Sequence, residues 1–239
     1  MTTPIWISHR GMSQQHDENT RAAFELACDA GFSWLETDLH STKDNHIILC
    51  HDPTPDKTSS CSGNIAEMTR AELEKIQLKK GGKYLFLDEF IVAFKKQHWV
   101  FDIKPDTAAQ TLKTIRNLLI DDKTLLNKIT FLFWNKELQE NFLKDFPDAI
   151  CFSRKAQCYQ PGIAALFGLS MLGNIKKNTI YSIFPKKLGL ALINKRVVQT
   201  FHQRGAQIIG FLPSTTAEVQ LCLDAGVDYI LSDDRPVSC

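Results

Sequence analysis

The chain has 239 residues, and 44% of them are hydrophobic, which is enough apolar material for the core of one large domain. Its formal net charge is only +1, and we interpret the lysines and arginines as spread along the chain, so a nucleic acid is not expected as a partner. The seven cysteines include no CxxC pair, so a structural zinc site is not expected either.

The N-terminal segment MTTPIWISHRG lacks the basic and apolar regions of a signal peptide, which favours a cytoplasmic protein with free thiols. The uncharged stretch at residues 158–175 is polar at its start and interrupted by glycines. Its apolar centre is shorter than the roughly 20 residues that cross a bilayer, so no transmembrane segment is expected.

Short apolar runs alternate with amphipathic patterns along the chain. The apolar runs predict eight strands: Ile5–Ser8, Trp34–Leu39, Trp99–Ile103, Ile129–Phe133, Ala149–Phe152, Thr179–Ile183, Gln207–Leu212 and Tyr229–Leu231. The patterns between them predict helices over Thr20–Ala30, Asp88–Lys96, Thr107–Leu119, Lys136–Asp145, Asn194–Arg204 and Thr216–Asp224. Asn19 or Thr20 is a suitable N-cap for the first helix, and Gly31 stands where a glycine would end it.

Eight strands that alternate with helices are typical of a closed parallel barrel, so the predicted fold class is α/β, a (β/α)8 TIM barrel. No glycine-rich phosphate loop follows the first strand, which argues against a dinucleotide-binding fold. Residues 53–83 are rich in Thr, Ser, Lys and Gly and do not fit the alternation. We predict that they form a small insertion after the second strand, within a single domain that covers residues 1–239.

The second predicted strand carries charged side chains where a core strand should be apolar. In WLETDLHSTKDNHIILCHD, residues 34–52, Glu36 and Asp38 stand two apart and therefore project to the same side. If the chain reverses in the turn sequence STKDN, His51 returns to the level of Asp38. Two close carboxylates repel each other unless a cation lies between them, so this pattern predicts a divalent metal site.

Two further strand ends carry polar groups of suitable kinds. The first strand ends in His9, Arg10 and Gly11, and arginine offers a planar fork for phosphate oxygens. The third ends in Asp102 and Lys104, which again stand two apart and on one side. Because the C-terminal ends of barrel strands converge, we expect these groups to meet at a site for metal and phosphate.

Each motif taken alone has a simpler structural explanation. The tripeptide HRG and the dipeptide HD are weak signals, and Glu36 and Asp38 could belong to a salt-bridged edge strand. His40 stands at the turn and is not assigned to the site, whereas we interpret Asp52 as a residue that orients His51. The joint arrangement at several strand ends favours the functional interpretation.

With these motifs the sequence resembles the glycerophosphodiester phosphodiesterase family. The matching segments are SHRG, ENTRAAFELACDAGFSWLETDLHSTKDNHIILCHDPT, GNIAEMTRAELEKI, FLDEFIVAF, FDIKPD and GVDYILSDDRP, in family order from residue 8 to residue 236. The resemblance implies a barrel phosphodiesterase that requires a divalent metal, Mg²⁺ or Ca²⁺. It also implies a small-molecule glycerophosphodiester substrate, which is cleaved to glycerol 3-phosphate and an alcohol.

The resemblance further assigns roles to individual residues. His9 and His51 correspond to the catalytic histidine pair, Arg10 and Lys104 to phosphate-contacting residues, and Glu36, Asp38 and Asp102 to metal ligands. One histidine would take a proton from the nucleophile and the other would protonate the leaving alcohol, and the sequence leaves open which does which. Asp102 departs from the family pattern, which usually has glutamate there. The tryptophan that often ends the seventh strand in the family is also absent, and Phe211 is the candidate to replace it as an aromatic wall for the glycerol.

Two alternative functions stay open. An aspartate at position 102 is similar to the residue of a related, sphingomyelinase D-like branch, so the first alternative is a lysophospholipase D or sphingomyelinase D-like activity. The second alternative is a catalytically silent barrel that binds a phosphorylated ligand. Residues 161–173, PGIAALFGLSMLG, are interpreted as a buried helix with its flanking loop. The alternative for this segment is an apolar lip that accepts an acyl chain or makes a weak contact with a membrane.

Overall fold

The structure is a computed structural model, and it describes residues 3–168, 173–187 and 189–234. The chain divides into two compact units, residues 8–150 and residues 1–7 with 151–239. That the whole chain forms a single domain stays a prediction. Within the described ranges no helix is long and apolar enough to cross a membrane, and a cytoplasmic location stays a prediction of the sequence.

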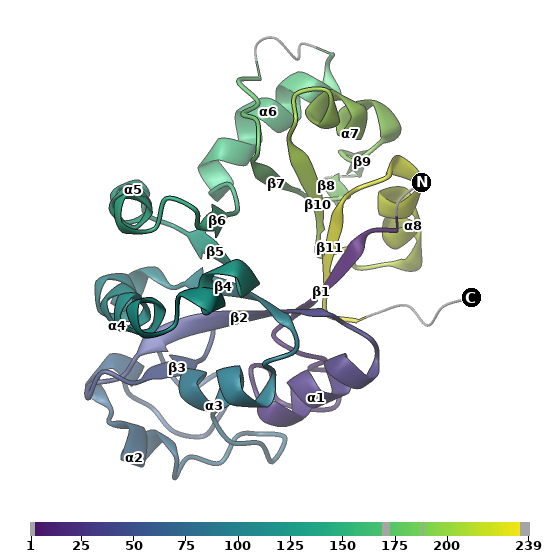
Figure 1. Cartoon of the computed structure of the whole chain (residues 1–239). Helices are drawn as coiled ribbons and strands as arrows, with labels where there is room; N and C mark the ends of the chain where they lie inside the picture. Colours follow the sequence, from purple (N-terminus) through teal and green to yellow (C-terminus); the bar gives the residue numbers. More distant parts are fainter. Residues whose placement is uncertain (1–2, 169–172, 188, 235–239) are drawn as a thin grey trace. The chain divides into compact units, whose positions relative to one another are not determined.

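All eight predicted barrel strands are present, and Figure 1 shows how helices separate them along the chain. Their bounds are β1 (Ile5–His9), β2 (Trp34–Ser41), β4 (His98–Ile103), β5 (Ile129–Phe133), β6 (Ile150–Cys151), β7 (Ile180–Ile183), β10 (Gln207–Phe211) and β11 (Tyr229–Ser232). The pairs β2–β4, β4–β5, β7–β10 and β10–β11 are parallel. Parallel neighbours joined through helices are the βαβ units that the sequence predicts.

The larger unit, residues 8–150, contains the strand order β5–β4–β2, with the end of β1 and the start of β6 at its borders. Its helices are α1 (Arg21–Asp29), α2 (Arg70–Leu73), α3 (Leu87–Ala93), α4 (Ala108–Asp121) and α5 (Lys136–Asp145), with 3-10 turns η1 (Ile65–Glu67), η2 (Pro105–Thr107) and η3 (Lys123–Lys128). The hydroxyl of Thr20 accepts a hydrogen bond from the N–H of Ala23 and caps α1, and Gly31 follows the helix with a φ of +86°. Both predicted boundary residues of this helix are confirmed.

The smaller unit contains the strand order β11–β10–β7 and the first residues of β1. Its helices are α6 (Lys155–Leu166), α7 (Lys195–His202) and α8 (Thr216–Ala225), and its short strands β8 (Lys186–Lys187) and β9 (Leu190–Ala191) pair with each other in antiparallel orientation. A core of aliphatic and aromatic side chains, including Phe201 and Ile208, holds these elements together. The two short strands were not predicted, because two residues are too few to show a pattern.

Residues 53–83 form the predicted insertion. It follows the short strand β3 (Ile47–Leu49), which pairs with β2 in antiparallel orientation after the chain reversal that the turn sequence predicts. Ile65 and Leu73 of the insertion are fully buried in a hydrophobic cluster with Ile48 of β3. The insertion therefore has a small core of its own, which fixes it against the strand pair.

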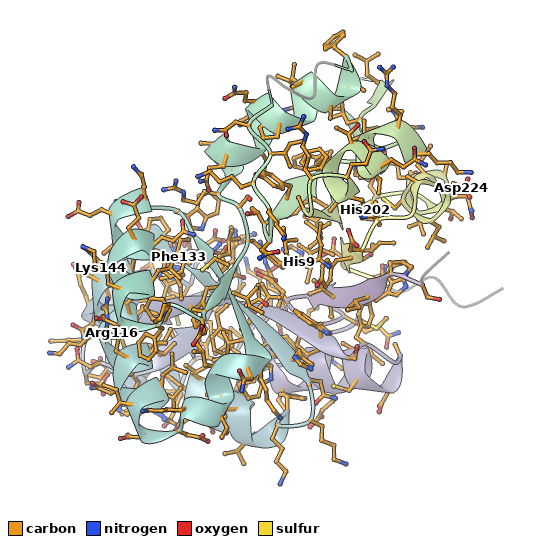
Figure 2. The ribbon with its side chains drawn as sticks, turned by 45° about the horizontal axis from the view of Figure 1, so that its top comes forward. His9, Arg116, Phe133, Lys144, His202 and Asp224 are labelled. Carbon is orange, nitrogen blue, oxygen red and sulfur yellow. The ribbon has the colours of Figure 1, made fainter. Side chains whose placement is uncertain are left out.

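Alternation along β4 separates the hydrophobic core from the polar site. Trp99 and Phe101 project to one side and are fully buried, with Phe101 6.3 Å from Phe131 of β5 between ring centroids. In Figure 2 Phe133 lies at the end of β5, and its ring continues this aromatic core 6.0 Å from that of Phe131. Asp102 alternates with these rings and therefore projects to the opposite side of the strand.

Candidate active site

Carboxylates from β2 and β4 meet near the C-terminal ends of these strands. The parallel register pairs Asp38 with Asp102, and Glu36 stands two residues earlier on the same side of β2. One oxygen atom from each of the three carboxylates lies within 4.8 Å of the others. Glu36, Asp38 and Asp102 are 4%, 0% and 4% exposed. β2 lies between β4 and β1 in the sheet, so the alternative of a salt-bridged edge strand is wrong. Three buried acidic groups at this spacing could hold a divalent cation.

Lys104 places its ammonium group between two of these carboxylates. Its Nζ lies 2.8 Å from Oδ1 of Asp38 and 2.7 Å from Oδ2 of Asp102. Burial alone would lower the pKa of Lys104, but the two carboxylates raise it above its usual value. The residue therefore remains a cation at the acidic cluster, and its pairing offsets the desolvation of the three charges.

Arg10 reaches the same cluster from the end of β1. Its φ of +58° lies in the left-handed region, which is uncommon for a residue with a side chain. In this conformation its backbone N–H donates to the carbonyl oxygen of Glu36 at 3.1 Å and lies 3.2 Å from Oε2 of the same residue. Its Nε lies 2.9 Å from Oδ2 of Asp38. The unusual backbone thus directs one cationic side chain at the acidic cluster.

Burial and neighbouring charges give the three carboxylates different pKa values. Burial, and then the charge of Asp38, raises the pKa of Glu36 to about 8. Burial opposes ionisation of Asp38 as well, but Lys104 and Arg10 outweigh it and lower the pKa of Asp38 to about 2. Burial raises the pKa of Asp102 above its ordinary value, although Lys104 opposes this effect. Such divergence within one cluster is typical of functional sites.

His51 follows β3 and is positioned by two neighbours. The N–H of Cys50 donates to the carbonyl oxygen of Asp38 at 3.0 Å, which extends the strand pairing up to His51. Nδ1 of His51 lies 2.7 Å from Oδ1 of Asp52, the contact expected if that carboxylate orients the ring. His40, which the sequence left outside the site, has its Nε2 3.2 Å from the carbonyl oxygen of His51.

His9 is the last residue of β1, and Figure 2 labels it there. It directly precedes Arg10, whose backbone is hydrogen-bonded to Glu36. Burial is the largest effect on the pKa of Glu36 and raises it, whereas an imidazolium at His9 would lower it. The sequence-predicted site residues from β1, β2 and β4 therefore belong to one place in the larger unit.

Asn19 belongs to the site although the sequence gave it only a capping role. Its φ is +58°, and its side-chain amide donates to Oδ2 of Asp38 at 2.8 Å. Its amide oxygen accepts a hydrogen bond of 2.8 Å from the hydroxyl of Thr37. A polar residue just before a helix reads as an N-cap, so nothing local in the sequence could reveal these contacts.

Trp134 is a second residue of the site that the sequence did not predict. Its indole Nε1 donates to Oδ1 of Asp102 at 2.6 Å, and the Nζ of Lys104 lies 5.6 Å from its ring centroid. Half of the residue is exposed. An aromatic residue directly after a predicted strand was the available signal, but only the β4–β5 pairing brings it to a carboxylate.

Comparison with known proteins decides the family. The model of the glycerophosphoryl diester phosphodiesterase family matches residues 9–236. The chain belongs to this family. A glycerophosphodiester phosphodiesterase of Caldanaerobacter subterraneus subsp. tengcongensis is 23% identical to it over 95% of this chain and 93% of the relative. Membership in the glycerophosphoryl diester phosphodiesterase family places the chain among the phosphoric diester hydrolases, as the resemblance predicted.

Solved structures of the family confirm the fold. A glycerophosphoryl diester phosphodiesterase domain from Mycobacterium tuberculosis has a TM-score of 0.82 at 14% identity and covers 97% of this chain and 96% of its own. A phosphodiesterase of Oleispira antarctica, solved in complex with the product sn-glycerol-3-phosphate, has a TM-score of 0.77 at 20% identity and covers 96% and 93%. The predicted (β/α)8 TIM-barrel class is confirmed by this similarity.

Proposed function

We propose that this family member hydrolyses glycerophosphodiesters to glycerol 3-phosphate and an alcohol. The observation that carries the proposal is the buried cluster of Glu36, Asp38 and Asp102, with Arg10 and Lys104 paired to it. A phosphodiester is an anion that gains charge on attack, and cationic groups fixed beside a metal site suit that change. The product bound by the Oleispira relative supports glycerol 3-phosphate as the product here.

The residues of the cluster fit a divalent metal ion, either Mg²⁺ or Ca²⁺. Both ions prefer carboxylate oxygens, and three such groups converge here. The pKa of Glu36, which burial and then Asp38 raise to about 8, supports this fit because nearby protein cations do not fully compensate the buried acidic groups. A divalent ion held by Glu36, Asp38 and Asp102 would supply Lewis-acid stabilisation of charge at the phosphoryl group.

Arg10 and Lys104 are proposed to bind the phosphate oxygens. An ammonium has three donors, so Lys104 can keep its contacts with Asp38 and Asp102 and still offer a hydrogen bond to substrate. Arg10 uses Nε toward Asp38 and Nη1 toward Glu18, which leaves Nη2 for a phosphate oxygen. The acidic cluster thus orients both cations before the substrate arrives, so little reorganisation is needed during the reaction.

His9 and His51 are proposed to carry out the acid–base chemistry. One imidazole takes the proton of the attacking hydroxyl, and the other gives a proton to the oxygen of the leaving alcohol as its bond to phosphorus breaks. The contact of Asp52 with Nδ1 of His51 leaves Nε2 of that ring for proton transfer. If the substrate's own glycerol hydroxyl attacks, a cyclic phosphate forms first, and its detection separates this route from direct attack by water.

The test is phosphate-product analysis with a panel of water-soluble glycerophosphodiesters and lysophospholipids, with and without a chelator. We expect release of glycerol 3-phosphate, loss of this activity with chelator, and recovery with Mg²⁺ or Ca²⁺. Activity that a chelator leaves unchanged would remove the metal from the proposal.

The same panel tests the two alternatives. Cleavage of lysophospholipids or sphingomyelin without cleavage of water-soluble glycerophosphodiesters would favour the lysophospholipase D or sphingomyelinase D-like activity. Binding of glycerol 3-phosphate without turnover of any substrate would favour the catalytically silent barrel.

A further inference from the structure

The charged residues of the chain are distributed unevenly. Residues 149–217 contain nine basic residues and no aspartate or glutamate, whereas the rest of the chain has 19 basic and 27 acidic residues. The basic residues are spread along the chain as predicted, and it is the acidic residues that this segment lacks. Its nine basic residues are Arg154, Lys155, Lys176, Lys177, Lys186, Lys187, Lys195, Arg196 and Arg204. All of them except the two half-buried residues Arg154 and Arg204 are exposed.

Helix α6 presents an apolar stripe within this basic segment. Tyr159, Ile163 and Phe167 follow one another at intervals of four residues, so they occupy one side of the helix and its C-terminal end. They are 49%, 57% and 70% exposed, whereas Ala165 of the same helix is fully buried. Lys155, four residues before Tyr159 and also exposed, extends the stripe with a cation.

This finding corrects the prediction for residues 161–173. A buried helix is wrong for Ile163 and Phe167, because more than half of each residue is exposed. The rest of the apolar segment, residues 169–172, lies outside the described residues. Within the described residues, the exposed apolar surface of this segment therefore consists of Ile163 in α6 and Phe167 at its C-terminal end.

Cationic side chains stand at both ends of the stripe. The Nζ of Lys187 in β8 lies 5.7 Å from the ring centroid of Tyr159. At the other end the guanidinium of Arg196 in α7 lies so close to Gly168 that a Cβ on this glycine would collide with it. Figure 1 shows α6 beside α7, the helix that supplies Arg196.

We propose that Tyr159, Ile163 and Phe167, with Lys155, Lys187 and Arg196 around them, form a docking surface for an anionic lipid membrane. The apolar side chains enter the boundary between headgroups and acyl chains, and the cations lie at the level of the negatively charged headgroups. The aliphatic stems of the lysines and the arginine can follow the same boundary while their charges stay in water. The chain would then bind the membrane surface through these residues.

Charge complementarity alone would also suit a nucleic acid, but the apolar stripe favours lipid. A nucleic acid presents phosphates to cations and base faces to aromatic rings. A nucleic acid has no aliphatic surface that could bury the exposed side chain of Ile163. A single apolar stripe that ends in Phe167 and has cations on its margins is typical of an interfacial helix. The surface belongs to the smaller unit, and its role goes beyond the proposed hydrolysis.

The test is co-sedimentation of the full chain with vesicles. Vesicles made of equal parts phosphatidylglycerol and phosphatidylcholine are compared with vesicles of phosphatidylcholine alone, at low and at high salt. We expect binding to the anionic vesicles that weakens with salt, because counterions screen exposed charges. Phe167→Ser should lower the partition coefficient about tenfold, and Lys187→Gln about fivefold.

Matched control variants lie on the larger unit. Val92→Ser replaces an exposed apolar residue of α3, and Lys113→Gln removes an exposed cation of α4. Both should bind vesicles like the parent, and all four variants should keep the parent's melting temperature and its turnover of a water-soluble substrate. No binding to anionic vesicles, or equal losses in the controls, would overturn the proposal. A duplex RNA that displaces the vesicles, or a dimer that Phe167→Ser dissociates, would assign the surface to a different partner and also overturn it.

Discussion

The two compact units of the chain use charge in opposite ways. In residues 8–150 the decisive charged groups are buried and paired, as in the contact of Lys104 with Asp38 and Asp102. In residues 151–239 the basic side chains lie mainly on the surface, beside apolar residues such as Phe167. Buried charges are stable only with fixed partners, so the first unit is built for chemistry at defined atoms. Exposed charges with apolar neighbours suit a diffuse, deformable partner.

The largest effect is expected for the proposed acid–base pair. His9→Ala and His51→Ala should each lower turnover of a glycerophosphodiester by about a hundredfold or more, because proton transfer contributes on this scale. The melting temperature should change little, since neither imidazole fills the hydrophobic core. Steady-state kinetics and thermal unfolding measure the two quantities. Near-normal turnover of either variant would take that histidine out of the mechanism.

Gly11 supports the cationic end of β1 and should be the most sensitive glycine of the site. Its φ is +77°, and a Cβ there would lie 2.6 Å from the carbonyl carbon of Ala23. Gly11→Ala should therefore lower the free energy of unfolding by about 3 kcal/mol, from backbone strain and forced displacement of α1. Gly81→Ala is the control, because φ is +90° there but nothing lies within 4 Å, and about 1 kcal/mol is expected. Equal losses in urea denaturation would mean that close packing at Gly11 contributes nothing.

Asp102 tests whether the buried cluster is a metal site. Asp102→Asn should raise the metal concentration needed for half-maximal activity by about tenfold or more, because two carboxylates would remain to hold the ion. Excess metal should restore part of the rate, and Asp102→Glu should be milder because it keeps the charge. Titration of Mg²⁺ or Ca²⁺ by calorimetry gives the affinity independently of turnover. Identical metal affinity in Asp102→Asn and the parent would exclude this residue as a ligand.

Trp134 should have a smaller effect on the same property. Trp134→Phe keeps an aromatic ring but removes the indole N–H that donates to Asp102. We expect metal affinity to fall about fivefold, the effect of one lost hydrogen bond to a charged group at a partly exposed position. The intrinsic fluorescence of the parent should also respond to metal, and that response should be lost in the variant. An unchanged affinity would leave Trp134 only as a wall of the site.

The smallest effect on soluble substrates is expected at the exposed stripe. Phe167→Asp should leave turnover of a water-soluble glycerophosphodiester unchanged, because the side chain is 70% exposed on the smaller unit. If lysophospholipids are substrates, their cleavage from anionic vesicles should fall, since the variant introduces a negative charge at the lipid contact. Equal losses of turnover on both kinds of substrate would mean that Phe167 supports the fold. The smaller unit would then no longer differ from the larger one by an exposed lipid-binding surface.

Some residues of the candidate site could be predicted from the sequence, and others could not. Glu36 and Asp38 were found because alternation on a strand is a strict local rule, and Asp102 was found by the same rule on β4. Asn19 and Trp134 were missed because their contacts with Asp38 and Asp102 cross between elements that the sequence does not place. The absence of acidic residues from residues 149–217 was visible in the sequence. It pointed to a membrane surface only after the structure showed the exposed apolar stripe of α6.

The sequence by itself determined the order of the eight barrel strands, the family, and the residue types that gather at the strand ends. These follow from short-range periodicity, since side chains repeat every two residues on a strand and about every 3.6 on a helix. Only the tertiary structure decided that Asp38 stands beside Asp102, that Lys104 bridges them, and that α6 leaves Phe167 in solvent. Register between strands and the exposure of a helix face depend on residues far apart in the chain, so local patterns cannot specify them.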